Sequence, residues 1–455
     1  MKLIYFNRVY FSAAYIIVFF FIFGISFNSK AQLQQIDEAI LQIPSQSEVS
    51  IETLVKYIET KAQNETEKAR AAFCWIANNI RYDVRKYMKG KPSNFEPQKV
   101  FKKRKAVCAG YANLYQALCR KMNLDCEMVS GYSKGISYKR GQAFNESDHV
   151  WNAVKTDTAW RLVDATWAAG YLKKTALITI FKPQYDDKYF IIKPDEFILN
   201  HMPEVPMWQL QTHPVSLKAF AADDGKIVDE LKKQKSPFFN FNDSITHFLS
   251  KDSSAMALDF GKMAIRFNSN NPVPLAFGML KNVDDKIHGK ITEAELTPIV
   301  TDSLIYFTEN AIKLFKKARS ANKAVKEHLE DNIKMAQRIR ASLHGYKAMQ
   351  MELQLINANK PSLDSLNYFS NQIIKSHLIV LHTYRESHNK RLIKELEEKY
   401  CNASLNLYNI YQSDSVKEPQ LEKSYQKQAR QIISTAKKNL TISSDCVKSI
   451  FEIKN

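Results

Sequence analysis

Three residue types that can act together as nucleophile, base and orienting acid occur in order along the chain. Cys108 lies in KAVCAGYANLYQALC, His149 in NESDHVWNAV and Asp164 in WRLVDATW. A thiol becomes a strong nucleophile when an imidazole takes its proton, and a carboxylate can hold that imidazole in the required tautomer. The three residues therefore predict a catalytic triad.

Cys108 is expected to open a helix, because apolar or small residues recur at helical spacing from Cys108 to Met122. The unpaired amides and the positive end of the dipole at a helix start favour the thiolate. The basic run at residues 102–105 adds a weaker bias in the same direction. The alternative is that Cys108 is only a small buried apolar residue, which is the usual fate of a free cysteine.

His149 and Asp164 are expected to share one face of a hairpin. Residues 149–167 have the pattern of two strands, 149–155 and 159–167, joined by a polar turn near residues 156–158. A two-residue turn at the first two of these positions places His149 directly opposite Asp164. A turn at the last two makes them diagonal neighbours on the same face.

Three tryptophans, Trp151, Trp160 and Trp167, flank the two residues in the sequence. Large apolar side chains around a polar pair predict a walled groove at this place. The alternative is an exposed cross-strand pair, which would contribute only a few tenths of a kcal/mol, with no chemical role.

The blocks that contain these residues resemble the transglutaminase-like superfamily of papain-related Cys-His-Asp proteins. They are VCAGYANLYQALCRKMNLDCEMVSGYSKG and DHVWNAVKTDTAWRLVDATWAAGYL, preceded by ARAAFCWIANNIRYDV. The tail KYFIIKPDEFILNHMPEVPMWQL resembles a narrower, kyphoscoliosis-peptidase-like branch. The resemblance spans residues 69–212. It implies that Cys108 is the nucleophile, His149 the general base and acid, and Asp164 the orienting carboxylate.

The oxyanion hole is only half assigned by the sequence. One donor is expected to be the amide of Cys108 itself, whereas the second is left open. Trp75 and Gln98 lie upstream and are the two side chains considered for it, with a core position as the alternative for Trp75. The chain also departs from the family by having alanine and glycine, instead of proline, in DATWAAGYL.

Residues 1–31 are expected to be a secretory signal peptide. Lys2 and Arg8 precede an apolar run from Val9 to Phe27, and the small residue Ala31 suits a cleavage site. An uncleaved N-terminal membrane anchor is the alternative, because the run nearly reaches the length of a span. The protein is therefore expected to be exported, and periplasmic or secreted if it is bacterial.

Neither a metal nor another cofactor is expected. The six cysteines show no zinc-binding spacing, although Cys401 and Cys446 could form a disulfide in an oxidising compartment. No acidic loop has the pattern of a calcium site. The net charge of +18 comes from basic residues scattered among acidic ones, so we expect a solvated surface and no nucleic-acid partner.

The expected fold class is α+β. Residues 32–68 are predicted to be helical lead-in segments, and residues 69–220 a transglutaminase-like or papain-like catalytic domain whose nucleophile helix packs on an antiparallel sheet. Residues 221–243 are predicted to be a polar linker. Residues 244–455 are predicted to form a helical bundle or a helical repeat.

Two classes of function fit these features. The first is an exported enzyme that transfers acyl groups from amide bonds of proteins or peptides through a Cys thioester, with either water or an amine as the acceptor. The second is a non-catalytic binding or scaffold protein of the cell envelope. In either case, the helical C-terminal region is expected to bind either a partner protein or the substrate presented to the catalytic domain. The chain is not expected to contact a membrane after signal cleavage.

Overall fold

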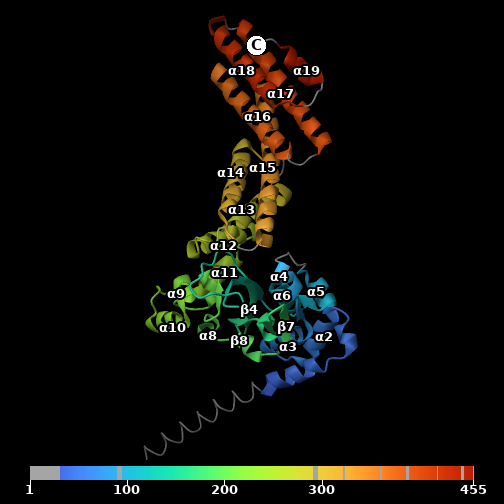
Figure 1. Ribbon diagram of the computed structural model, residues 1–455, viewed down its shortest axis with the longest axis vertical. Helices are drawn as coiled ribbons and strands as arrows, with labels where there is room; N and C mark the ends of the chain where they lie inside the picture. Colours follow the sequence, from blue (N-terminus) through green and yellow to red (C-terminus); the bar gives the residue numbers. More distant parts are fainter. Residues whose placement is uncertain are drawn as a thin grey trace, which may run out of the picture. The chain divides into compact units, whose positions relative to one another are not determined.

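A computed structural model describes residues 31–89, 95–290, 296–320, 323–358, 361–385, 389–417, 419–441 and 445–453 (Figure 1). The expected signal peptide, apart from Ala31, lies outside these residues. No helix among the described residues is long and apolar enough to span a membrane. The chain forms two compact units. The first contains the described residues up to Ser250, with Arg266–Asn271 and the described part of Arg319–Val325, and the second contains the rest.

A five-stranded antiparallel sheet forms the centre of the first unit, with the strand order β8-β5-β4-β3-β9. Its members are β3 (Cys126–Ser133), β4 (His149–Thr156), β5 (Ala159–Val163), β8 (Phe190–Ile192) and β9 (His201–Pro203).

The β4–β5 hairpin has the second of the two predicted registers, because Thr156 pairs with Ala159 and Asn152 with Val163. The two turn residues, Asp157 and Thr158, have φ of 50° and 69°. Two successive left-handed residues are typical of the tightest hairpin turns, whose twist matches that of the strands. Strand β5 ends at Val163 and not at Trp167 as expected, because helix α7 (Ala165–Ala168) begins there.

The predicted nucleophile helix is confirmed as α6 (Cys108–Lys121), with Cys108 as its first residue. Its apolar face, which includes Tyr111, Tyr115 and Leu118, belongs to the main core, and the helix packs against β3 and β4. A short parallel pair, β1 (Arg81–Tyr82) with β2 (Lys105–Ala106), leads directly into this helix. The packing of the helix in the core and the β1–β2 pair just before it therefore both fix the start of α6.

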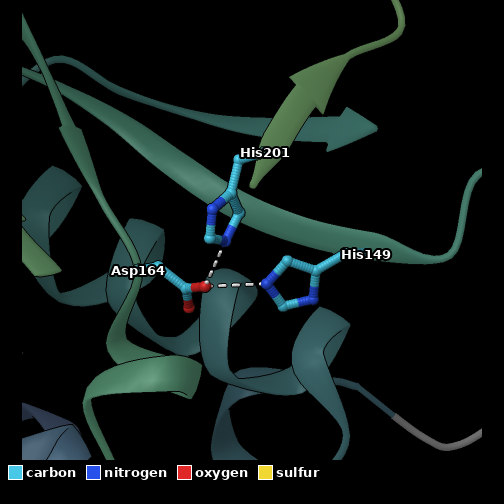
Figure 2. Close-up of side chains that lie close together, drawn as sticks. All are labelled: His149, Asp164 and His201. Carbon is cyan, nitrogen blue, oxygen red and sulfur yellow. Dashed lines mark hydrogen bonds and ion pairs between the residues drawn. The ribbon is translucent and has the colours of Figure 1, made fainter. Parts of the chain in front are cut away.

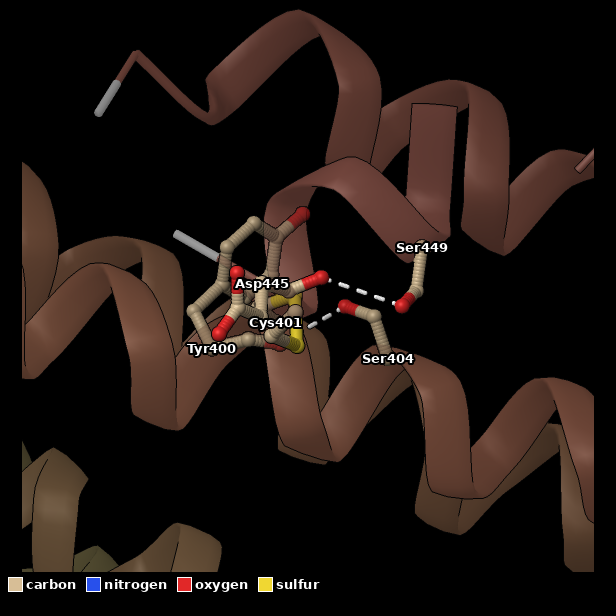
Figure 3. The surroundings of a disulfide bond; sticks show 6 residues. Tyr400, Cys401, Ser404, Asp445 and Ser449 are labelled. Atoms are coloured by element: carbon tan, nitrogen blue, oxygen red, sulfur yellow. Dashed lines mark hydrogen bonds between the residues drawn. A yellow bond between two sulfur atoms is a disulfide. The ribbon is translucent and has the colours of Figure 1, made fainter. Parts of the chain in front are cut away.

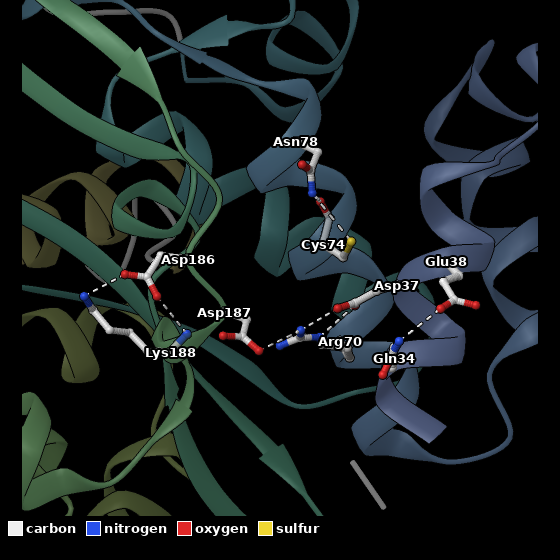
Figure 4. Close-up of polar contacts among 9 residues, drawn as sticks. All are labelled: Gln34, Asp37, Glu38, Arg70, Cys74, Asn78, Asp186, Asp187 and Lys188. Carbon is white, nitrogen blue, oxygen red and sulfur yellow. Dashed lines mark hydrogen bonds and ion pairs between the residues drawn. The ribbon is translucent and has the colours of Figure 1, made fainter. Parts of the chain in front are cut away.

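The predicted lead-in residues share the core of the predicted catalytic domain. Residues 31–41 are helical, and Ile36 and Ile40 join the core together with residues of α2 (Ile51–Lys61) and α3 (Glu65–Asn79). Figure 4 shows the polar link between the two parts: Arg70 of α3 donates two hydrogen bonds to Asp37, of 2.8 and 2.5 Å. The Arg70 side chain is almost fully buried, so this bidentate pair fixes the first helix against α3.

The segment 221–243, expected to be a linker, contains a helix of the first unit. Helix α10 (Asp224–Lys233) begins at the N-cap Asp223 and buries Ile227 completely in a cluster with Tyr132 and Phe220. Its composition is polar because only one narrow face is buried. The first unit therefore continues through α11 (Phe241–Leu249).

The remaining elements of the first unit are short segments around the sheet. They include α4 (Val84–Lys89), α5 (Pro97–Lys103), the hairpin of β6 (Gly170–Lys174) and β7 (Thr179–Pro183), α8 (Pro194–Phe197) and α9 (Leu217–Ala222), with the 3-10 turns η1 (Ser45–Glu48), η2 (Asp187–Tyr189) and η3 (Pro206–Gln209).

All described elements of the second unit are helices, so the α+β fold with an all-α C-terminal part is confirmed. Helix α17 (Lys390–Lys417) packs against both α16 (Leu363–Arg385) and α18 (Glu422–Asn439). Cys401 on α17 forms a disulfide with Cys446 on α19 (Asp445–Glu452), as the sequence suggested (Figure 3). The other helices are α12 (Ser253–Phe267), α13 (Val273–Asp285), the π-helix η4 (Lys286–Lys290), α14 (Pro298–Lys317), α15 (Lys323–Asn357) and the turn η5 (Pro419–Leu421).

Candidate active site

The structure brings His149 and Asp164 into direct contact. His149 is the first residue of β4, and Asp164 follows β5 as the N-cap of α7. The Nε2 atom of His149 lies 2.7 Å from Oδ2 of Asp164 (Figure 2). Both side chains are buried, with exposed fractions of 5% and 0%. The expected pairing of these two residues is therefore present, although Asp164 reaches it from a helix cap and not from a strand.

Asp164 accepts four hydrogen bonds. Its Oδ1 accepts from the backbone N–H groups of Thr166 (2.8 Å) and Trp167 (3.1 Å), and its Oδ2 accepts from Nε2 of His149 and, at 3.0 Å, of His201. Burial by itself raises the pKa of this carboxyl group, but the charge and hydrogen bond of His149, followed by the bond from His201, hold it well below its usual range. Asp164 is therefore a carboxylate at neutral pH.

The thiol of Cys108 is near enough to His149 to raise the pKa of the imidazole. Because Nε2 is bound to Asp164, Nδ1 is the ring nitrogen left to interact with this thiol. Burial lowers the pKa of His149, yet the charge and hydrogen bond of Asp164, and then the thiol of Cys108, raise it to about 10. Cys108 itself is half-buried, whereas Cys74, Cys119 and Cys126, which are also free, are buried. An imidazole held by a carboxylate on one side can act as a base toward a thiol on the other.

Tyr82 is a residue of the site that the sequence did not indicate. Strand β1 pairs with β2 so that Tyr82 lies beside Ala106, two residues before Cys108. Its ring contacts Tyr87, Tyr111 and Phe181. Its hydroxyl has no hydrogen-bond partner among the residues that the structure describes. Burial, followed by the charge of Cys108, raises the pKa of Tyr82 well above its usual range. The hydroxyl therefore stays protonated and can donate a hydrogen bond.

The two side chains considered for the oxyanion hole lie elsewhere. Trp75 is fully buried in the core, stacks on Phe101 and donates its indole hydrogen to Oε1 of Glu48 at 2.7 Å. Gln98 is exposed on α5. Neither can therefore be the second donor in this conformation.

His201 is the second residue of the site that sequence reasoning missed. It is fully buried, and its ring lies between Trp167 and Phe197, with centroid distances of 4.3 and 4.0 Å. Burial, together with the charge of His149, lowers its pKa to about 4, although Asp164 acts in the opposite direction. Its only signal in the sequence is its position in the tail block FILNHMPEV.

The donor atoms of His149, Asp164 and His201 lie within 4.8 Å of one another, a spacing that could hold a metal ion. Each Nε2 atom already has a hydrogen-bond partner in Oδ2 of Asp164. A metal at this place would displace both ring hydrogens and separate His149 from its carboxylate. The hydrogen bonds account for the cluster without a metal, and we assign it none.

A cavity of about 620 Å³ opens beside His149. Trp167 forms part of its wall, as expected, and Trp151 is buried behind His149. Trp160 corrects the prediction, because it lies near the turn end of the hairpin and packs on Trp208 at 5.4 Å. The walls are rich in aromatic side chains, two of which, Tyr171 and Phe181, come from the β6–β7 hairpin. The others are Tyr82, Tyr87, Trp167 and Tyr189.

Residues 52–165 match the family model of the transglutaminase-like superfamily, so Cys108, His149 and Asp164 lie inside the match and His201 lies beyond it. Mouse kyphoscoliosis peptidase is 32% identical over 245 residues, which are 54% of this chain and 35% of that protein.

Two further relatives are more distant. Hillarin of Drosophila melanogaster is 26% identical over 260 residues, covering 53% of this chain and 29% of hillarin. The Lim and transglutaminase domain protein ltd-1 of Caenorhabditis elegans is 27% identical over 220 residues, covering 46% of this chain and 28% of that protein. The chain thus matches 35% or less of the length of these three relatives.

Proposed function

Because the chain carries a transglutaminase-like domain of the kyphoscoliosis-peptidase branch, we propose that this domain is a cysteine-dependent acyl-transfer enzyme acting on amide bonds of proteins or peptides. The observation that supports this most directly is the buried contact of 2.7 Å between His149 and Asp164, with the thiol of Cys108 near enough to raise the pKa of the imidazole. Cys108, His149 and Asp164 are then the nucleophile, the general acid and base, and the orienting carboxylate.

In the first half-reaction, the Cys108 thiolate attacks the carbonyl carbon of the amide, and the carbonyl electrons move to the oxygen. The backbone N–H of Cys108, unpaired as the first of its helix, and the hydroxyl of Tyr82 stabilise this oxyanion. When the carbon–nitrogen bond breaks, His149 gives its Nδ1 proton to the leaving amine. A thioester on Cys108 remains, and His149 is neutral.

In the second half-reaction, His149 takes a proton from the acceptor as the acceptor attacks the thioester. The products are an acyl group on oxygen or nitrogen and the original thiolate–imidazolium pair. Water as acceptor gives a peptidase and a primary amine gives a transglutaminase; both acceptors use the same residues.

Thiol labelling is the direct test, because the other free cysteines are buried. Iodoacetamide is expected to modify Cys108 near neutral pH faster than it modifies an ordinary thiol, and His149→Ala should slow this reaction at least tenfold. Cys108→Ser controls for labelling elsewhere. If the His149→Ala protein reacts as fast as the wild type, the enzyme proposal fails and a non-catalytic binding role remains.

The acceptor is tested with a glutamine-containing peptide and a fluorescent primary amine. Incorporation of the amine identifies a transglutaminase, whereas release of the cleaved peptide without incorporation identifies a peptidase. Both products must vanish in Cys108→Ser.

We further propose that the protein is exported and that the helical unit binds a partner protein. The apolar run at residues 9–27 and the Cys401–Cys446 disulfide both support an oxidising compartment. Fractionation of cells that express the tagged full-length chain tests this, because retention with cytoplasmic markers would contradict it.

A further inference from the structure

His201 occupies the last acceptor position of Asp164. An ionised carboxylate offers about four lone-pair sites. Two backbone N–H groups bind Oδ1, and His149 binds one site of Oδ2, so the bond of 3.0 Å from His201 fills the fourth (Figure 2). Because Asp164 is fully buried, no water takes part in its solvation through an exposed surface. The charge of Asp164 is therefore shared between two imidazoles.

Gly131 on β3 lets strand β9 come close enough to place His201 beside Asp164. On β3, Gly131 pairs with His149 on one side and with Pro203 on the other. His201 precedes Pro203 by two residues, so it lies on the same face of the sheet as His149. A Cβ atom at Gly131 would approach the backbone oxygen of Met202 to 2.3 Å. Only glycine permits β9 to come this close, and β9 carries His201.

Asp164 determines which nitrogen of His201 carries the hydrogen, because an ionised carboxylate can only accept a hydrogen bond. Nδ1 lies 2.5 Å from the atom placed as Oδ1 of Asn200, and Nε2 lies 3.0 Å from Oδ2 of Asp164. A neutral imidazole that donates from Nε2 must accept at Nδ1. An oxygen cannot donate to Nδ1, so we infer that the amide is turned over, with its NH2 group in place of Oδ1. Asn200 thus holds His201 in the tautomer that donates to Asp164.

We propose that His201 is a positioning residue: its Nε2–H group, held by Asn200, shares Asp164 with His149 and so limits how strongly Asp164 retains the proton of His149. The effect on turnover rests on the proposed acyl transfer. The sharing of Asp164 itself does not depend on it.

The sharing matters because His149 must both hold and release a proton. A carboxylate that bound His149 alone would attract its proton more strongly, and the second half-reaction requires His149 without that proton. Removal of the His201 donor should therefore raise the pKa of His149. The second half-reaction should then need a higher pH to reach the same rate. The titratable groups facing the two imidazoles are Asp164, Cys108, Asp148 and Tyr189.

Three variants separate the donor from its packing. His201→Phe retains a ring that can stack on Phe197 and fill the site but removes the donor. His201→Gln supplies a side-chain N–H toward Asp164. Asn200→Asp places a carboxylate at Nδ1, which draws the hydrogen to that atom or makes His201 cationic. His213→Phe is a matched control, because His213 bonds Ser236 in the same unit, away from the triad.

The measurement is the ring-nitrogen NMR titration of the histidines in a Cys108→Ser background, in parallel with the pH dependence of thioester hydrolysis in the protein with Cys108. We expect His201→Phe to raise the midpoint of His149 by about one pH unit, which corresponds to about tenfold slower hydrolysis of the thioester below that midpoint. His201→Gln should restore both values. His213→Phe should leave both unchanged even if it lowers the thermal midpoint.

The NMR arm also distinguishes two kinds of failure. If no variant forms a thioester but the midpoint of His149 still moves in His201→Phe, the proposed function fails and the sharing of Asp164 stands. If His149 titrates identically in the wild type, His201→Phe and Asn200→Asp, or if His201 is protonated at pH 7, the positioning role is refuted.

Discussion

Replacement of Asp164 by asparagine should disable Cys108 through the wrong tautomer of His149. The amide oxygen of the introduced side chain can still accept from the N–H groups of Thr166 and Trp167, so the cap of α7 is retained. Its NH2 group then points at His149, whose Nε2 must accept. The single ring hydrogen therefore moves to Nδ1, the atom that has to receive the proton of the thiol.

The size of the effect follows from the pKa of His149. In the wild type this pKa is raised to about 10, and without the charge of Asp164 the burial of the ring leaves it at or below the ordinary 6.5. At pH 7.5, the imidazolium fraction then falls from nearly complete to about a tenth or less. Labelling of Cys108 by iodoacetamide should slow at least about tenfold, and acyl transfer should fall by about 10⁴-fold.

The pH dependence has a definite sign at each end. A raised pKa of His149 means that its contribution to stability is complete below 6.5 and is lost as the pH rises toward 10. A lowered pKa of Asp164 means that its contribution is present above 3.8 and is lost as the pH falls below that value. The difference in thermal midpoint between wild type and Asp164→Asn should therefore be largest between pH 3.8 and pH 6.5, where both contributions are complete.

Asp223→Asn is the matched control, because Asp223 caps α10 with a bond of 2.9 Å to the N–H of Lys226. It should leave the labelling of Cys108 unchanged. If Asp164→Asn reacts within twofold of the wild type at pH 7.5 while remaining folded, the assignment of the orienting role to Asp164 is refuted.

Three further changes test other parts of the structure. Tyr82→Phe should lower kcat/KM for amide cleavage by about 10²–10³-fold and leave iodoacetamide labelling within twofold, and an equal loss in both assays would contradict an oxyanion role. Cys401→Ser opens a disulfide across 45 residues and should destabilise the helical unit by about 4 kcal/mol, measured by denaturant unfolding, with Cys108 labelling unchanged; an unaltered unfolding curve would show that the crosslink adds nothing. Arg70→Leu leaves Asp37 without its bidentate partner, so residues 31–41 should exchange amide hydrogens at least tenfold faster, and unchanged protection there would show that apolar packing alone holds this helix.

The nucleophile helix could be predicted because its signal is local. The apolar spacing from Cys108 onward specifies one buried face, and the structure retains that face. The hairpin was predictable for the same reason, since alternation and a polar two-residue turn are short-range features. What the strand pattern concealed was the start of α7. Asp164 followed by Ala165 and Thr166 is an N-cap signal, and the β-propensity of Trp167 masked it.

His201 could not be predicted from local patterns. It contacts Asp164 across a sequence separation of 37 residues, through a strand order in which β9 and β5 are separated by two other strands. Tyr82 was hidden in the same way, because only the β1–β2 pairing brings it to the start of α6. The helix α10 was missed for another reason: its mean composition is polar, and one face with Ile227 is enough to dock it.

The placement of Asp164 makes the chemistry conditional on the fold. Asp164 binds the N-terminal N–H groups of α7 through one carboxylate oxygen and His149 through the other. The turn after β5 must therefore form before His149 is held in the tautomer that a base requires. In a nascent, partly unfolded or damaged chain, Cys108 lacks this oriented base. Under the proposed acyl transfer, such a chain would not react with neighbouring proteins, and the rate at which Cys108 reacts can serve as a direct readout of correctly folded protein.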